Sequence, residues 1–150
     1  MAVSTDKIFT THAIEMYDHD PDASTATDVE WVDMKGYRNF AVVAMVSALA
    51  GSTGITAFTI LGDSDNDGGS GSNVTIKTHA VGTACDAVGD YLVLECTADE
   101  IAELGEDNSV DLRYVSANLT VGNAGDECVV TYIRTGARFE YDALTADTIS

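Results

Sequence analysis

Alternation of apolar and polar residues with a period of two is the feature that most restricts the fold of this chain. Between residues 91 and 97, Leu92, Leu94 and Cys96 fall on one phase, and Tyr91, Val93 and Glu95 fall on the other. The segment from residue 73 to 81 alternates in the same way. Successive side chains of a strand point to opposite faces, so this pattern predicts half-buried β-strands. Helical periodicity is nearly absent, and the chain is predicted to be mainly β.

A second pattern occupies residues 37 to 49, where the run from Phe40 to Val46 is apolar on both phases. Such a run is typical of a central strand covered on both sides, or of a buried helix. Its β-branched residues favour a strand, as does the Gly51–Gly54 turn that precedes the β-rich run from Ile55 to Leu61. We therefore expect a strand hairpin here.

The last third of the chain contains a change of phase. Apolar residues share one phase up to Tyr114 and then move to the other, on Val115, Ala117, Leu119 and Val121. One extra residue in a strand produces such a slip, which predicts a β-bulge near Tyr114. Residues 128–134 and 137–141 are expected to form either two strands or one long strand kinked at Gly136.

One helix is predicted, at residues 97–104. Thr97 and Glu100 have the spacing of a capping box, Ile101 and Leu104 supply an apolar side, and Gly105 is a typical terminator. With about eight or nine short strands, the fold class is an antiparallel β-sandwich or a barrel-like domain. We expect residues 1–27 to be an N-terminal arm, possibly extended, and residues 28–150 to be a single β domain.

The charge balance restricts the partners. Twenty-five acidic residues against seven basic ones give a formal net charge of −18. Such a protein repels phosphate, so we expect no nucleic-acid partner and no membrane partner. The longest apolar stretch, residues 40–50, is far shorter than the roughly 20 residues of a membrane-spanning helix. A hydrophobic content of 45% indicates a packed core, so the acids are expected on its outside.

The cysteine pattern predicts buried thiols. Cys85, Cys96 and Cys128 are odd in number, stand 11 and 32 residues apart, and form no CxxC pair. These spacings fit neither a disulfide framework nor a zinc site. We expect free cysteines that pack as small apolar side chains.

The segment Asp63–Gly68 reads D-x-D-x-D-G, the first half of a calcium-binding EF-hand loop. Asp63, Asp65 and Asp67 are therefore candidate metal ligands, for Ca²⁺ or Mg²⁺. The twelfth position holds Val74 instead of a bidentate acid, and no helical pattern flanks the loop. The alternative is a solvated acidic turn. No other cofactor is expected.

Catalytic motifs are missing from the sequence. It contains no HExxH, GxSxG, GxxxxGK or GxGxxG pattern, and we expect the protein not to be an enzyme. Four arginines, Arg38, Arg113, Arg134 and Arg138, lie on or beside predicted strands. In so acidic a chain they are expected to pair with carboxylates, either within the sheet or on another subunit.

Several segments resemble a group of small virion proteins of tailed bacteriophages. Residues 29–37, Val-Glu-Trp-Val-Asp-Met-Lys-Gly-Tyr, match the group's W-x-D/S-x-K-x-Y element ahead of an apolar strand. Residues 97–100 precede a strand like 110–120, and residues 132–139 resemble the group's terminal G-A-R-Y/F. The resemblance covers roughly residues 28 to 141 and contains no catalytic motif.

This resemblance implies a β-sandwich with a structural role on the particle. The expected protein is a head decoration, or cement, protein that binds the major capsid protein on the outside of the capsid and stabilises it. Such proteins are commonly trimers, located on the virion surface and assembled in the host cytoplasm, and the arm would serve as a tether. The alternatives are a neck or tail component, and a calcium-dependent binding module that uses the 63–68 loop.

Overall fold

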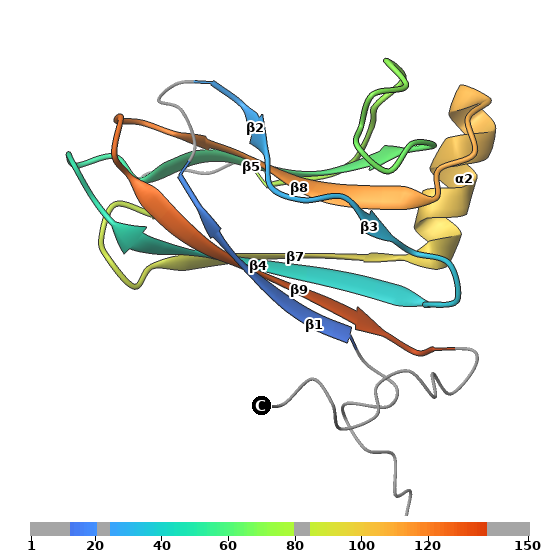
Figure 1. Ribbon diagram of the computed structural model, residues 1–150, viewed down its shortest axis with the longest axis horizontal. Helices are drawn as coiled ribbons and strands as arrows, with labels where there is room; N and C mark the ends of the chain where they lie inside the picture. The colour runs from blue at the N-terminus through green and yellow to red at the C-terminus, as the bar shows by residue number, and fades with distance from the viewer. Residues whose placement is uncertain (1–12, 21–24, 80–84, 138–150) are drawn as a thin grey trace, which may run out of the picture.

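Two antiparallel β-sheets packed face to face form the body of the protein (Figure 1). The computed structural model describes residues 13–20, 25–79 and 85–137. The first sheet has the order β1-β9-β4-β7 and contains β1 (Ala13–His19), β9 (Glu127–Thr135), β4 (Asn39–Ala48) and β7 (Tyr91–Thr97). The second sheet contains β2 (Thr27–Asp28), β3 (Val32–Asp33), β8 (Tyr114–Val121), β5 (Ile55–Asp63) and β6 (Val74–His79).

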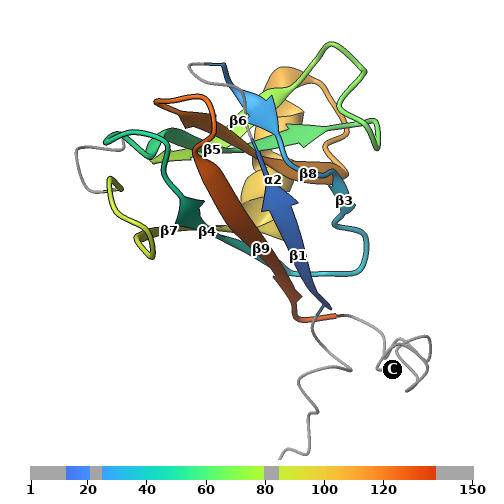
Figure 2. The same cartoon turned by 60° about the vertical axis from the view of Figure 1, so that its left-hand side comes forward.

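The strand order defines a jelly roll. In the second sheet β2 and β3 both pair with β8, followed by β5 and β6, so the two short strands act as one interrupted edge strand. From β6 onward the chain alternates between the sheets, and this interleaving is typical of the double-sheet jelly roll. The helix α2 (Ala98–Asn108) lies at one end of the sandwich in Figure 1, and the turned view of Figure 2 shows it behind the strands. The predicted antiparallel β-sandwich with one short helix is confirmed.

The core lies between the sheets and follows the predicted alternation. Leu92, Leu94 and Cys96 are buried in β7, while their neighbours in the strand are exposed. The apolar run from residue 40 to 46 is a strand, not a helix, and β4 lies between β9 and β7 as expected of a central strand. The expected hairpin is wrong, because β4 belongs to the first sheet and β5 to the second. Its inner phase is completely or almost completely enclosed, at Phe40, Val42, Ala44 and Val46.

The β domain begins earlier than the sequence suggested. Residues 13–19, expected in the arm, pair antiparallel with β9, from Ala13 opposite Arg134 to His19 opposite Cys128. The inner phase of this strand carries Glu15 and His19, so it lacks the apolar alternation by which a strand is recognised. The boundary at residue 27 is therefore corrected to residue 13, and residues 1–12 lie outside the described part of the chain.

The helix is one turn longer than predicted. Its start is confirmed: Thr97 and Glu100 form a reciprocal capping box. Its end is not at Gly105 but at Asn108, with Ser109 as a left-handed cap. Gly105 is needed inside the helix for close packing, because a Cβ atom there would lie 2.6 Å from the backbone oxygen of Val110.

The expected bulge near Tyr114 is wrong. Residues 110–113 form an irregular connection, and β8 begins at Tyr114, so the apolar phase changes where the strand starts. Register shifts occur instead in β4, between Val46 and Ala48, and at two places in β5. Strand β9 ends at Thr135, before Gly136 with a φ of 68°. Residues 138–141 of the expected last strand lie outside the described residues.

A buried tyrosine hydroxyl connects the two sheets. Tyr132 of β9 is fully enclosed, and its hydroxyl accepts a hydrogen bond from the backbone N–H of Ala117 in β8 at 2.7 Å. The same hydroxyl donates to the backbone oxygen of Glu30 at 3.0 Å. The ring packs edge-on against Phe40 and Tyr17, with centroid distances of 5.1 Å to each. One side chain of the first sheet thus satisfies two backbone groups on the second-sheet side of the core.

Replacement of Tyr132 by Phe tests this connection. The substitution keeps the ring but leaves the N–H of Ala117 and the carbonyl of Glu30 without their partner, so the free energy of unfolding should fall by about 1–3 kcal/mol. Urea denaturation followed by circular dichroism measures the change. Tyr91→Phe is the matched control, because Tyr91 is 66% exposed and should change stability by less than about 0.5 kcal/mol. Equal stability of both variants would contradict the role of the hydroxyl.

Candidate interaction surface

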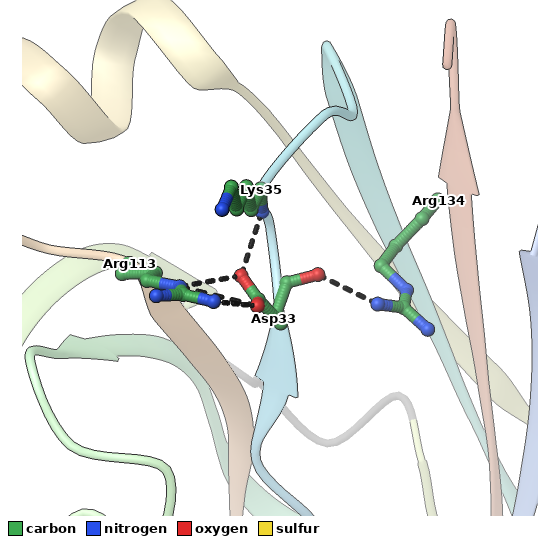
Figure 3. Close-up of polar contacts among 4 residues, drawn as sticks. All are labelled: Asp33, Lys35, Arg113 and Arg134. Carbon is green, nitrogen blue, oxygen red and sulfur yellow. Dashed lines mark hydrogen bonds and ion pairs between the residues drawn. The ribbon is translucent and has the colours of Figure 1, made fainter. Parts of the chain in front are cut away.

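A brace of charged side chains joins the sheets near α2, as Figure 3 shows. The Nε of Arg113, just before β8, donates to Asp33 Oδ1 at 3.0 Å and to Oδ2 at 3.1 Å. Arg134 of β9 donates to the backbone oxygen of Asp33 at 2.6 Å and to the Glu15 carboxylate at 2.8 Å. Two of the four arginines therefore pair with acids inside the chain, in agreement with the intramolecular alternative.

The brace shifts the titration of its carboxylate. The hydrogen bonds from Arg113 hold the pKa of Asp33 below its ordinary value, against a smaller opposing effect of burial. The backbone N–H of Lys35 adds a hydrogen bond of 2.8 Å to Asp33 Oδ1. A carboxyl group whose pKa is lower in the folded than in the unfolded state stabilises the fold above its unfolded pKa, and this contribution is lost as the pH falls through the folded pKa.

We therefore expect the contribution of Asp33 to disappear in acid. At pH 7, Asp33→Asn should lower the urea midpoint, and the difference from the wild type should shrink as the pH falls below about 4, the ordinary pKa of an aspartate. Denaturation curves at a series of pH values measure this difference. Arg113→Gln should reproduce the loss at pH 7, and the double variant should add little to it. A midpoint difference that stays constant down to pH 2 would contradict the assignment.

The acidic loop is organised by Asp63, which is completely buried at the end of β5. Its Oδ1 accepts hydrogen bonds from the backbone N–H of Asp65 at 3.1 Å and from the hydroxyl of Ser64 at 3.3 Å. Burial raises the pKa of Asp63, but hydrogen bonds from Ser70 and from Ser64 and Asp65 outweigh it, so the net pKa is lowered. Asp63 therefore acts as an acceptor that fixes the loop.

The described structure does not gather the other two candidate ligands around Asp63. Asp65 and Asp67 are exposed, and the described residues contain no group of three or more acidic, histidine or cysteine side chains placed to hold a metal ion. The loop also packs against the body, because Gly68 lies so close to the Trp31 indole that a Cβ atom there would be 2.6 Å from it. The calcium site stays a prediction of the sequence.

Calorimetry decides the calcium prediction. Ca²⁺ is titrated into the wild type and into Asp65→Ala, which removes an exposed carboxylate and leaves Asp63 in place. A site built from the three aspartates should give saturable heat in the wild type and a loss of about tenfold or more in affinity in the variant. Equal heat in both proteins, or none in either, would remove the metal site.

All three cysteines are free and buried, as the sequence predicts. Burial raises the pKa of Cys96 and of Cys128 to about 12. A thiol reacts as its thiolate, so these side chains are unreactive at neutral pH and serve as core residues.

The outer side of the first sheet carries several exposed apolar side chains. No described helix or strand lies over it in Figure 1. We call the middle part of this side the apolar face and define it by three outward residues from each of β1, β9, β4 and β7. They are Ile14, Met16, Asp18, Val129, Thr131, Ile133, Ala41, Val43, Met45, Tyr91, Val93 and Glu95.

Five of these side chains are large, apolar and exposed. The exposed fractions are 69% for Met16, 66% for Tyr91 and 45% for Ile14, with Val93 and Met45 at 41% and 39%. An antiparallel sheet whose outer side faces water normally carries polar residues there. A contiguous exposed apolar patch usually marks a site of interaction.

The second sheet provides the comparison within the same molecule. Its outward residues include a row formed by Asp28, Asn118, Thr59 and Thr78 on four neighbouring strands. All four are polar, and Asn118 donates a hydrogen bond to Asp28. The corresponding middle row of the apolar face reads Met16, Thr131, Val43 and Val93. Of these two rows, only that of the first sheet consists largely of apolar side chains.

The sequence predicted the outward apolar residues of β4 and β7 but not their exposure. The run of residues 40–46 predicted a strand covered on both sides, and Val93 was assigned to the outward phase of its strand. The structure covers one side of β4 with the core and leaves Met45 on the other side exposed. The apolar face combines these residues with Ile14 and Met16 of β1, a segment that the sequence placed in the arm.

Comparisons with known proteins give distant structural likenesses only. No protein-family model and no curated protein matches the sequence. Among solved structures, PRD1 vertex protein P5 is similar with a TM-score of 0.47 and 11% identity, over 84% of this chain and 96% of that one. A Bacillus endospore appendage, from a family of disulfide-linked pili, has a TM-score of 0.42 and 16% identity, over 83% and 88%. In the described residues, no helix is long and apolar enough to cross a membrane.

Proposed function

We propose that this chain is a non-enzymatic structural component of a virus particle, namely a head decoration protein on the outside of a tailed-phage capsid. The observation that carries the structural role is the apolar face: five large apolar side chains are exposed together on one sheet of a closed sandwich. A surface of this kind is suited to being covered in an assembly. The tailed-phage resemblance of residues 28–141 supports the particular location.

The rest of the molecule is better suited to a rigid binding role than to catalysis. The sandwich is braced across its core by Tyr132 and at the α2 end by Arg134, which donates to the backbone oxygen of Asp33. The cysteines have raised pKa values and are enclosed. A rigid domain that loses little conformational freedom on docking is favourable for stabilising a shell. The proposed partner is the major capsid protein, and assembly would take place in the host cytoplasm.

The proposed tether is shorter than the sequence first suggested. Since β1 occupies residues 13–19, the proposed tether is residues 1–12. The arm would leave the domain at the edge of the first sheet, where β1 begins. A segment that orders on binding can add contact area without changing the domain.

Cosedimentation with capsids tests the function. The probe is a preparation of mature-form heads assembled from the major capsid protein of the same genome. We expect the wild type to sediment with the heads, and a variant lacking residues 1–12 to bind about tenfold or more weakly, which corresponds to ~1.4 kcal/mol. The deletion leaves β1 intact, so its urea denaturation curve should match the wild type.

Two results would contradict this proposal. Absence of the wild type from sedimented heads at every concentration would remove the decoration role. Binding to purified necks or tails in the same assay, without binding to heads, would favour the alternative location. Head binding that does not change on removal of residues 1–12 would remove the tether alone.

A further inference from the structure

We propose that the apolar face is a self-association surface and that its occupant is a second copy of this chain, packed sheet to sheet around a two-fold axis. This inference concerns the domain itself and does not depend on the capsid. The decoration-protein resemblance implies a trimer, whereas a face-to-face pair is a dimer. A measurement of the oligomeric state therefore distinguishes the face-to-face dimer from the trimer.

The registers of the four strands place the residues of the face on a regular grid. The middle row is Met16, Thr131, Val43 and Val93, in the order β1, β9, β4 and β7. On one side of it lies the row Asp18, Val129, Met45 and Tyr91, and on the other side the row Ile14, Ile133, Ala41 and Glu95. Ten of the twelve positions are uncharged.

The two charged residues lie at diagonally opposite corners of this grid. Asp18 ends one outer row on β1, and Glu95 ends the other outer row on β7. A two-fold axis in the plane of the interface and parallel to the strands brings β1 of one copy over β7 of the other. Asp18 then faces Tyr91, and Glu95 faces Ile14, so no acid faces an acid.

The same axis places the residues of the middle row of one copy over those of the other. Met16 of one copy lies over Val93 of the other, and Thr131 lies over Val43. Each of these contacts occurs twice, as an isologous interface requires. Two sheets that pack face to face keep their strands within about 30° of each other, so this correspondence holds best at the centre of the face.

The rim of the face is polar, as in specific interfaces. Beyond the row that contains Ile133 lie Asn39 and Thr135, and Asn39 donates a hydrogen bond to the Thr135 hydroxyl at 3.1 Å. Beyond the row that contains Met45 lies Glu127, opposite Ala48. The apolar area therefore ends within the sheet.

Charge favours a second copy over a basic partner. The centre of the face carries no acid that could pair with a basic surface, and only the corners Asp18 and Glu95 would be available. For a chain with a net charge of −18, the uncharged centre is the part of the surface where two copies can meet without placing carboxylates together.

The size of the face predicts a weak pair. Four strands about 4.8 Å apart and a length of five residues at about 3.4 Å each give a footprint of roughly 300–500 Å² per copy with the side chains included. Stable specific interfaces bury about 800 Å² per partner. The pair should therefore form at high concentration, and salt should strengthen it by screening the repulsion between two acidic molecules.

Sedimentation velocity of the full chain tests the proposal, over a range of concentrations at 0.05 M and 1 M NaCl. We expect a monomer–dimer equilibrium whose association constant rises by tenfold or more at the higher salt. Met16→Glu should weaken it by tenfold or more, because it places a carboxylate under Val93 of the other copy. Tyr91→Glu is a second variant at a well-exposed position, in case the first alters the fold.

Thr78→Glu is the matched control. It introduces the same charge at an exposed strand position on the outer side of the second sheet, and it should change the association constant by less than twofold. Urea denaturation of each variant establishes that the domain is folded.

Several outcomes would overturn the inference. They are a strict monomer under all conditions, a trimer in place of a dimer, association that weakens with salt, or association that responds equally to Met16→Glu and Thr78→Glu. A wild type that stays monomeric while Met16→Glu abolishes cosedimentation with heads would assign the face to the capsid. That result would support the proposed function and overturn the self-association.

Discussion

The hydroxyl of Tyr132 is the interaction on which the arrangement of the second sheet depends. It takes the backbone N–H of Ala117, which a neighbouring strand would otherwise bind, and it donates to the carbonyl of Glu30. The edge strand is therefore interrupted between β2 and β3. This interruption brings Trp31 against Gly68 of the acidic loop, and it carries Asp33 to the position where Arg113 and Arg134 meet it. One buried hydroxyl thus satisfies two backbone groups at the break in this edge.

The acidic residues have two separate uses in this molecule. Asp63 and Asp126 are completely buried and accept hydrogen bonds from backbone N–H groups where the chain turns. Asp63 accepts from Asp65 in its own loop, and Asp126 accepts from Asn123 in its own loop and from Ala50 in the connection after β4. Other acids, Asp65 and Asp67 among them, remain exposed on the surface. The apolar face stands out against this background because the acids occur only at two of its corners.

The sequence predicted those elements whose signals are local. Leu92, Leu94 and Cys96 defined β7, and the capping box at Thr97 defined the start of α2. Strand β1 was missed because its inner residue Glu15 becomes suitable for that position only through Arg134, 119 residues away. The end of α2 was missed because Gly105 serves packing against Val110 instead of termination. The doubly apolar run of β4 predicted two covered sides, and a sequence pattern does not distinguish cover by the same chain from cover by another molecule.

The pairing of β1 with β9 also sets the order in which the molecule can be completed. Within the described strands, β9 is the neighbour of β1 in the sheet, and it ends at Thr135. A ribosome must therefore release almost the entire domain before the first strand has a partner, so the first sheet closes late in synthesis. Until β9 has been made, β1 has no strand to pair with, and Tyr17 and Tyr132 are not in contact. The nascent chain is therefore the form of the protein most exposed to misassembly.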